Sequence, residues 1–373
     1  MLSSKQQAFE LFNKSQNILI VLPANHTTDS LGSGLALAML ARELGKKTDL
    51  IAQEPVAEKL SFLPGLEMLK SEVAPLRAFI ISIDTSEKKI KQLRYENKDS
   101  VLKIFLAGPD KLEQKDIRLD PGPFNYDALI VIDAPDLETL GQFYEKYTDL
   151  FFEKPILNID HKSGNEYFGE VNLVEPTASS CAEIIADFLN SFFPNQIFAP
   201  IATCLLAGII EETRSFQKTN TTPQTFNLAS LLITQGAEKE KIVQFLYKTK
   251  PLKYLRLWGR LLSSLDVDRE KNLAWVAIEP AEFEQLQPSF DDLAAISEEI
   301  NDLVPQLNAS ILLWNDNSDW TEALVQSLKP ELLQKLNLEL GGSLKNHQVF
   351  FKITEQDLTL ARANLASLIN PLL

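Results

Sequence analysis

The sequence predicts a two-domain α/β protein, with an N-terminal doubly wound, mostly parallel sheet and a smaller C-terminal α/β domain. Three observations predict it. The chain has 373 residues, more than one domain usually holds. Continuous apolar runs alternate with helical patterns over residues 1–236, as in parallel sheets covered by helices on both faces. A second, shorter alternation of strands and helices starts near residue 269.

The apolar runs of the first domain predict its strands. They are expected at 17–22, 48–53, 78–83, 101–106, 128–132 and 155–159. Asp84, Asp133 and Asp160 directly follow three of these strands. Ligands of a doubly wound sheet bind beyond the carboxyl ends of its strands, so we expect these carboxylates at the functional edge. A turn-forming role is the alternative for each, and for Asp84 the two readings have equal weight.

The rest of the chain predicts a connector and a second domain. Residues 237–268 keep apolar periodicity and contain no run of glycine and serine, which predicts helices that join the two domains. The second domain is expected at 269–373. Its predicted strands are at 273–278, 309–314, 322–328 and 349–353, with helices between them.

Charge and composition exclude several functional classes. The chain has 36 Lys and Arg against 51 Asp and Glu, a net charge of −15, which argues against binding to long duplex nucleic acid. Its two cysteines, Cys181 and Cys204, lie far apart in apolar segments, which excludes a disulfide framework and a zinc–thiolate site. The polar start of the chain and the short apolar runs predict no signal peptide, no membrane partner and a cytoplasmic location.

Acidic and imidazole side chains at the predicted ends of strands and helices form a candidate metal site. They are Asp29, Asp133, Asp160, His161 and Glu212. Carboxylate and imidazole ligands suit Mn²⁺ or Mg²⁺, which can lower the pKa of a bound water and hold a phosphoryl oxygen. Gly32 and Ser33 begin a helical pattern, where the backbone would either bind an anion or make a tight packing turn.

The order of these residues resembles the DHH/DHHA1 phosphoesterases, especially the branch of nano-RNases and pAp phosphatases. The resemblance spans nearly the whole chain. It rests on NHTTDSLGS at 25–33, YDALIVIDAPDLETLG at 126–141, NIDHKSGNEYFGEVNLVEPTASSCAEII at 158–185, LAGIIEETRSFQKTNTT at 206–222 and VQSLKPELLQKLNLELGGSLKNH at 325–347. It implies two adjacent divalent metal ions that are bridged by Asp133.

Several positions depart from the family pattern, and the largest loss concerns one of the two ions. The family's His and Asp ligands for the first ion correspond here to Pro23 and Thr27, neither of which is a useful ligand. The ligands implied for the second ion are all oxygen or nitrogen donors: Asp29, Asp133, His161 and Glu212, the last in place of an aspartate. His26 is expected to be a polar loop residue, or else to turn inward and replace the lost histidine.

The resemblance also implies catalytic and substrate-binding residues. The implied catalytic residues are Asp133, Asp160, His161 and Lys162. Lys162 replaces a histidine that contacts phosphate in the family, and a salt bridge from Lys162 to Asp133 or Asp160 would mean that a side chain has replaced a metal ion. The implied substrate-binding residues are Ser33, Lys162, Lys329, Gly341, Gly342 and Lys345. Lys329 stands where the family has an arginine, and for Lys345 a solvated loop is the alternative reading.

Two functions from different classes follow. The first is a degenerate, catalytically inactive or impaired homologue that binds a nucleotide, a short single-stranded nucleic acid or a protein partner in the interdomain cleft, with one metal ion or none. The second is an active phosphoesterase that cleaves short oligoribonucleotides or pAp with one remaining Mn²⁺ or Mg²⁺. A protein-assembly factor unrelated to nucleotides is a third reading. The missing ligands favour the first, and so does the loop at Gly341, Gly342 and Ser343, which lacks the GGGH and AAG motifs that the resemblance implies for the second domain.

Overall fold

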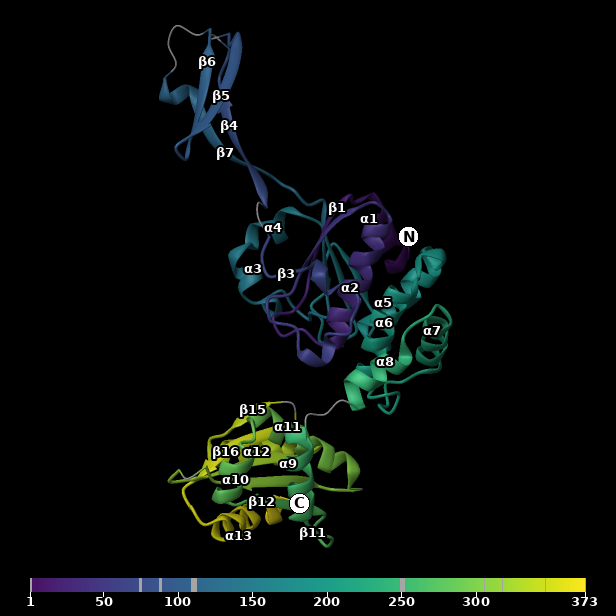
Figure 1. The fold of residues 1–373 in the computed structure, drawn as a ribbon, viewed down its shortest axis with the longest axis vertical. Helices are drawn as coiled ribbons and strands as arrows, with labels where there is room; N and C mark the ends of the chain where they lie inside the picture. The colour runs from purple at the N-terminus through teal and green to yellow at the C-terminus, as the bar shows by residue number, and fades with distance from the viewer. Residues whose placement is uncertain are drawn as a thin grey trace. The chain divides into compact units, whose positions relative to one another are not determined.

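The computed structural model describes residues 2–73, 76–86, 89–108, 113–248, 252–304, 306–316, 318–345 and 347–372. The chain divides into two compact units, Met1–Thr249 and Lys250–Leu373 (Figure 1). Both units are α/β, which confirms the predicted fold class. The helices predicted at 237–268 are divided between the units. In the part of the chain that the structure describes, no helix combines the length and the apolar character needed to cross a membrane.

The first unit contains a six-stranded sheet in which every pair of neighbouring strands is parallel. The strand order is β10-β9-β8-β1-β2-β3. The strands are β1 (Asn17–Val21), β2 (Lys47–Ile51), β3 (Leu69–Lys70), β8 (Ala128–Ile132), β9 (Ile156–Asp160) and β10 (Val171–Val174). All five residues of β8 are buried, as its apolar sequence predicts for a strand covered on both faces.

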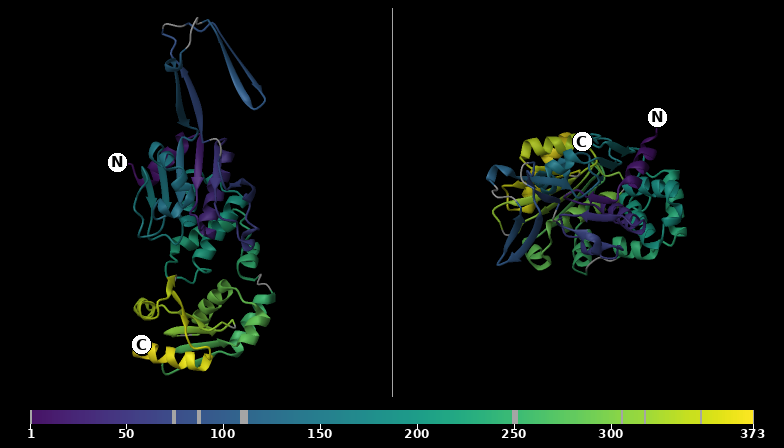
Figure 2. Two further views of the ribbon diagram at one scale, coloured as in Figure 1. Left: turned by 90° about the vertical axis from the view of Figure 1, so that its left-hand side faces the viewer. Right: turned by 90° about the horizontal axis from the view of Figure 1, so that it is seen from above.

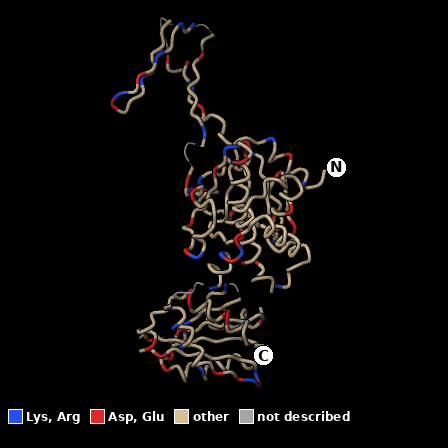
Figure 3. Tube along the Cα trace, turned by 45° about the vertical axis from the view of Figure 1, so that its right-hand side comes forward, with Lys and Arg blue, Asp and Glu red and all other residues tan. Residues whose placement is uncertain are grey.

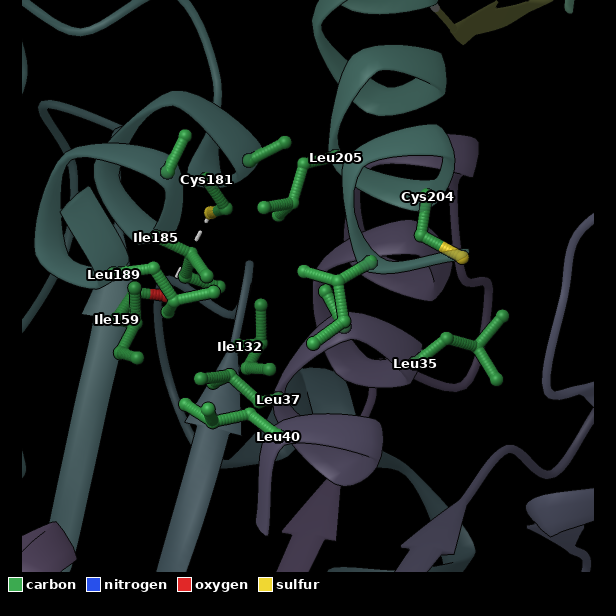
Figure 4. Packing of buried hydrophobic residues seen from close by; sticks show 14 of the residues in the cluster. Leu35, Leu37, Leu40, Ile132, Ile159, Cys181, Ile185, Leu189, Cys204 and Leu205 are labelled. Atoms are coloured by element: carbon green, nitrogen blue, oxygen red, sulfur yellow. Dashed lines mark hydrogen bonds between the residues drawn. The ribbon is translucent and has the colours of Figure 1, made fainter. Parts of the chain in front are cut away.

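Helices cover both faces of this sheet and form one core on each. Ile18 and Ile130 belong to one core, whereas their chain neighbours Leu19 and Leu129 belong to the other. The helices are α1 (Ser4–Lys14), α2 (Thr28–Glu43), α3 (Gln142–Lys146), α4 (Thr148–Glu153), α5 (Cys181–Phe192), α6 (Ala199–Glu212), α7 (Pro223–Thr234) and α8 (Lys239–Val243). Figure 4 shows how α2, α5 and α6 pack over the ends of β8 and β9.

The contact between α2 and α6 explains Gly32. A Cβ atom at this position would lie 2.4 Å from the carbonyl oxygen of Cys204, in α6. No side chain fits at that distance, so glycine allows the two helices to approach. Of the two roles considered for the start of this helix, the structure therefore supports the packing role for Gly32.

Two of the predicted strands do not join the parallel sheet, and this part of the prediction is wrong. β4 (Arg77–Ile83) pairs antiparallel with β7 (Ile117–Phe124), and β5 (Gln92–Lys98) pairs antiparallel with β6 (Val101–Ala107). We call residues 77–124 the ribbon insertion. A short apolar run does not distinguish a buried parallel strand from one strand of a ribbon. For this reason the sequence predicted these two strands in the wrong sheet.

Asp84 follows β4 in the ribbon insertion and so does not lie at an edge of the parallel sheet. Its Oδ1 accepts hydrogen bonds from the backbone N–H and the hydroxyl of Ser86, at 2.9 and 2.5 Å. This is the turn-forming role, one of the two considered for Asp84.

The second unit has a six-stranded mixed sheet with helices on both faces (Figure 2). The strand order is β11-β12-β13-β14-β16-β15, and only the pair β12–β13 is parallel. The strands are β11 (Asp266–Asp268), β12 (Leu273–Ile278), β13 (Ala309–Trp314), β14 (Thr321–Gln326), β15 (Ser343–Lys345) and β16 (Gln348–Ile353). The helices are α9 (Leu252–Ser263), α10 (Pro280–Leu286), α11 (Phe290–Leu303), α12 (Pro330–Leu340) and α13 (Leu358–Ile369).

Candidate functional site

Asp29 lies in the first turn of α2 and is buried. Its carboxylate is bound by the N-terminus of another helix: Oδ2 accepts from the N–H of Cys181 at 2.7 Å and Oδ1 from the N–H of Ala182 at 2.8 Å. Ser180 caps this helix, α5, by accepting a hydrogen bond from Glu183 N–H. The positive end of the helix dipole and the two N–H groups stabilise a negative charge on Asp29.

Gly208 in α6 provides space for the Asp29 carboxylate, a role that the sequence motifs did not reveal. A Cβ atom at Gly208 would lie 2.9 Å from Oδ1 of Asp29 and 2.8 Å from the Cβ of Ala182. Both distances are shorter than van der Waals contact allows. Any larger residue here would displace either Asp29 or the start of α5.

Asp133 directly follows β8 and is also buried. Its backbone has a φ of 61°, in the left-handed region, which costs a non-glycine residue on the order of 1 kcal/mol or more. The Lys162 ammonium lies 2.5 Å from Oδ1 of Asp133 and 2.8 Å from its carbonyl oxygen. The hydroxyl of Thr27 donates to Oδ2 at 3.1 Å. Both carboxylate oxygens of Asp133 therefore have a hydrogen-bond donor from the protein.

Asp160 and His161 follow β9 and have different surroundings. Oδ1 of Asp160 accepts from the N–H groups of His161 and Lys162 at 2.8 and 3.2 Å, and Oδ2 accepts from the side-chain amide of Asn165 at 2.8 Å. Asp160 thus stabilises the turn. Nε2 of His161 lies 4.0 Å from Oδ2 of Asp29 and 3.9 Å from Oδ1 of Asp133.

One cluster of candidate metal ligands occurs among the residues that the structure describes. Asp29, Asp133, His161 and Cys181 each offer one ligand atom, and these atoms lie within 4.8 Å of one another. Two ligand atoms bound about 2.1 Å from one ion lie at most about 4.2 Å apart, and the imidazole nitrogen of His161 is within this distance of both carboxylates.

Cys181 adds little to this donor set. Burial and the nearby carboxylates raise the pKa of its thiol well above its usual value, and its Sγ contacts the carbonyl oxygen of Ile159 at 3.7 Å (Figure 4). Because a protonated thiol is a poor ligand and Mn²⁺ and Mg²⁺ prefer oxygen and nitrogen, the relevant ligands are those of Asp29, Asp133 and His161.

The electrostatics of the cluster favour binding of a cation. Burial and the charge of Asp133 raise the pKa of Asp29 well above its usual value. Burial also raises the pKa of Asp133, although Lys162 and His161 act in the opposite direction. Burial acts to lower the pKa of Lys162, but the charge of Asp133, the hydrogen bond to it and the charge of Asp160 together outweigh burial and leave this pKa raised. Lys162 contacts only Asp133, so within the described residues the neighbouring carboxylate of Asp29 has no cationic side chain on it, and a further cation would relieve the repulsion between the two carboxylates.

Glu212, the fourth ligand implied by the resemblance, ends α6 and lies outside this cluster. Its Oε1 accepts from the ammonium of Lys218 at 2.9 Å. Three successive residues, 214–216, have positive φ between α6 and Lys218. Lys218 thus supplies a positive charge beside this carboxylate, and a ligand role for Glu212 stays a prediction.

Two further residues of the first motif each have a buried polar atom but do not contribute to the cluster. The Ser33 hydroxyl and Nδ1 of His26 have no hydrogen-bond partner in the described part of the chain. Burial lowers the pKa of His26, although Glu54 acts to raise it. The imidazole in the ligand cluster is that of His161, not His26.

The implied substrate-binding residues of the second unit have clear local roles. Gly341 ends α12 with a φ of 64°, and a Cβ at Gly342 would lie 2.5 Å from the carbonyl oxygen of Phe350. Lys329 is the exposed N-cap of α12. Lys345 lines a cavity of about 480 Å³ whose walls include two aromatic rings, Phe290 and Phe350. A role of these residues in substrate binding stays a prediction.

Comparisons with known proteins agree with the motifs. Residues 17–209 match the DHH family, N-terminal domain. The chain is 32% identical over 110 residues to the bifunctional oligoribonuclease and PAP phosphatase NrnA of Thermus thermophilus, covering 30% of this chain and 33% of that protein. It is 39% identical over 99 residues to the cyclic-di-AMP phosphodiesterase GdpP of Bacillus subtilis, covering 25% of this chain and 15% of that protein.

A longer match and a solved structure extend these comparisons. A probable NrnA of Streptococcus mutans is 27% identical over 208 residues, or 55% of this chain and 60% of that protein. The chain therefore matches less than two thirds of the length of each of these relatives. The crystal structure of an exopolyphosphatase-related protein from Bacteroides fragilis superposes with a TM-score of 0.69 over 98% of this chain and 95% of that one. At 16% identity, this likeness concerns the fold alone.

Proposed function

This chain belongs to the DHH family, and on that premise we propose that it binds the phosphate groups of a nucleotide or a short single-stranded oligonucleotide but does not carry out two-metal hydrolysis. The observation that carries the proposal is the contact between Lys162 and Asp133. The family resemblance implies that Asp133 bridges two ions, and here a lysine ammonium lies on that carboxylate.

The environment of Asp133 supports the loss of the first ion. Lys162 contacts one carboxylate oxygen and the Thr27 hydroxyl contacts the other. A protonated lysine supplies a single positive charge, and it neither coordinates a water molecule nor lowers the pKa of one. The positions of the two missing ligands are Pro23 and Thr27. The pair of adjacent ions on which two-metal hydrolysis depends is therefore not expected to form.

The remaining cluster supports the binding half of the proposal. Asp29, Asp133 and His161 would hold one Mn²⁺ or Mg²⁺, because their ligand atoms converge and their combined charge is negative. When bound, such an ion supplies positive charge for a phosphoryl oxygen. The Lys162 side chain is 42% exposed, so its ammonium is also open to an anionic ligand.

A second candidate function is favoured by the same convergence of ligands. It is a phosphoesterase that cleaves short oligoribonucleotides or pAp with a single metal ion. Two of the relatives are named as bifunctional oligoribonucleases and PAP phosphatases, so short oligoribonucleotides and pAp are the substrates to test.

The experiment measures binding and turnover separately on the full chain. Binding of pAp and of a fluorescent RNA trimer is measured by calorimetry and anisotropy with Mn²⁺ or chelator, and product formation by chromatography. We expect binding without turnover, and loss of binding in Asp29→Asn. Lys218→Met is the matched control, because it breaks a lysine–carboxylate contact outside the cluster. Turnover that depends on Mn²⁺ and disappears in Asp133→Asn would establish the one-metal enzyme instead, and absence of binding would refute both.

A gain-of-function variant tests the cause of inactivity. Pro23→His, Thr27→Asp and Lys162→His together restore the residue types that the family resemblance implies. We expect this triple variant to bind a second Mn²⁺ and to hydrolyse the trimer or pAp. A variant that folds and binds two ions but stays inactive would show that the remaining departures, at Glu212 or in the second unit, prevent turnover.

A further inference from the structure

The ribbon insertion has no role in the proposed function, yet it carries a large uncovered apolar surface. We propose that a second copy of this chain docks on this surface, so that the protein forms a homodimer through the apolar faces of its ribbons. The argument uses the register of the two ribbons, the exposure of their side chains and the distribution of charge along the chain.

The ribbon β5–β6 is amphipathic. Directly opposite residues of an antiparallel pair project to the same face, and successive residues alternate between faces. One face combines the pairs Leu93–Leu106, Tyr95–Ile104 and Asn97–Leu102. The opposite face combines Arg94–Phe105, Glu96–Lys103 and Lys98–Val101. The first face is thus almost entirely apolar, and the second carries the charged residues.

The ribbon β4–β7 has the same division. Its apolar face combines the pairs Phe79–Pro121, Ile81–Leu119 and Ile83–Ile117. Its other face combines Ile80–Asp120 and Ser82–Arg118. Such a pattern in a soluble protein normally marks the side of a sheet that packs against another layer.

No other layer within the described part of the chain covers these faces. Each ribbon is a separate two-stranded sheet, and the exposed fraction reaches 68% for Phe79, 63% for Leu93 and 71% for Tyr95. Isolated two-stranded ribbons are marginally stable in water, and contiguous exposed apolar patches mark interaction sites. Both ribbons therefore gain stability when another molecule covers them.

The uncovered area matches the requirement of a dimer. The two apolar faces contain eight large apolar residues that are 40–71% exposed. At roughly 180 Å² for each such residue when fully exposed, they present about 800 Å² per chain. A stable interface of standard size buries about 800 Å² on each partner, so a second identical surface is sufficient to cover the first.

The distribution of charge favours a second copy over other partners. Residues 77–124 contain ten Lys and Arg and eight Asp and Glu, whereas the remainder of the chain contains 26 and 43. Figure 3 shows both signs interspersed along the insertion. Two copies of so acidic a chain repel each other everywhere except at this nearly neutral segment. The same mixture of signs disfavours nucleic acid and anionic lipid as the occupant.

The charged faces also favour a closed dimer over an open assembly. Lys98 and Lys103 lie on the face opposite the apolar one, where they hinder further stacking of ribbons. An apolar face that pairs with its own copy about a two-fold axis uses the whole surface once and leaves nothing for a third chain.

Two neighbouring residues of β6 provide a matched test. Leu102 lies on the apolar face and Val101 on the charged face, and they are 57% and 52% exposed. Sedimentation equilibrium of the full chain measures the dimer dissociation constant, which we expect to be about micromolar. Leu102→Glu is expected to raise it by about 100-fold and Val101→Glu by less than about threefold. Both positions are exposed, so the unfolding temperature of the main domains should be unchanged in both variants.

Four outcomes would overturn the proposal. One is a wild-type chain that is monomeric at all accessible concentrations. Another is a dimer that Leu102→Glu and Val101→Glu weaken equally. The third is a monomer in which a disulfide between Phe79→Cys and Tyr95→Cys forms within one chain, because the two ribbons would then cover each other. Binding of this surface to anionic vesicles or RNA, with no dimer, is equally incompatible with it.

Discussion

A Lys162→Met substitution removes an ammonium group but keeps a side chain of similar length. The buried carboxylate of Asp133 then loses the cation that lies 2.5 Å from its Oδ1. Breaking a fully buried ion pair costs about 3–5 kcal/mol, and partial exposure of the lysine reduces this to about 1–3 kcal/mol. A domain of this size loses roughly 2–4 °C in unfolding temperature per kcal/mol.

The same substitution should strengthen metal binding. The lysine charge repels any ion held by Asp29, Asp133 and His161, so its removal is expected to increase the affinity for Mn²⁺ by about tenfold or more. Bound metal stabilises the folded state, so Mn²⁺ should raise the unfolding temperature of the variant more than that of the wild-type chain.

The assay is thermal unfolding followed by circular dichroism, in chelator and in a series of Mn²⁺ concentrations, with calorimetry for the affinity. Lys218→Met is the control, because its partner Glu212 lies outside the ligand cluster. We expect the control to leave Mn²⁺ affinity within about threefold of wild type. A Lys162→Met protein with wild-type stability and wild-type Mn²⁺ affinity would refute the view that this lysine takes the place of a metal ion.

Three other substitutions test the packing around the site and the electrostatics at the opposite end of β8. Gly208→Ala places a methyl group 2.9 Å from Oδ1 of Asp29, so calorimetry should show Mn²⁺ affinity reduced by about tenfold or more and thermal unfolding a loss of about 1–3 kcal/mol. Gly32→Ala should lower the free energy of unfolding by a similar amount, about 1–3 kcal/mol, because the added methyl group meets a backbone carbonyl of α6 that cannot move aside. An unchanged unfolding temperature would contradict the packing role of Gly32. Burial acts to raise the pKa of Asp127, but the N–H groups of Asn17 and Gln16 outweigh it and lower this pKa. Because the folded-state pKa is below the usual value, the stabilisation is present at neutral pH and lost as pH falls through the folded-state pKa. The difference in unfolding free energy between wild type and Asp127→Asn, under about 1 kcal/mol, should therefore disappear in acid, and a constant difference would show another cause.

Strands buried on both faces were predictable from sequence because their composition leaves few alternatives. Residues 128–132, 273–278 and 309–314 are strands with the predicted bounds. The runs at 78–83 and 101–106 have a similar composition, yet they form amphipathic ribbons whose apolar side depends on the register with a partner strand. Register is a property of the pair, so neither run alone reveals which face is apolar or whether that face is covered.

The candidate site could likewise be predicted only in part from the sequence. The motifs identified Asp29, Asp133 and His161, and the structure brings these three together. The helix N-terminus that binds Asp29 and the space provided by Gly208 come from segments more than 150 residues away in the chain. No local sequence pattern predicts these contacts, because residues 181, 182 and 208 have the sequence of ordinary helical residues in their own segments.

The individual partners of the carboxylates explain how this site persists without two metal ions. A buried carboxylate is costly unless it is paired, and in a two-metal site the ions provide the pairing. Here Asp29 is bound by the N–H groups of α5, Asp133 by Lys162 and Thr27, and Glu212 by Lys218. Each carboxylate has its own donor from the protein, so the fold does not depend on metal for its stability. Under the function that we propose, loss of the first-ion ligands removes a reaction without removing the pocket, and a folded, charged pocket can still be selected for binding alone.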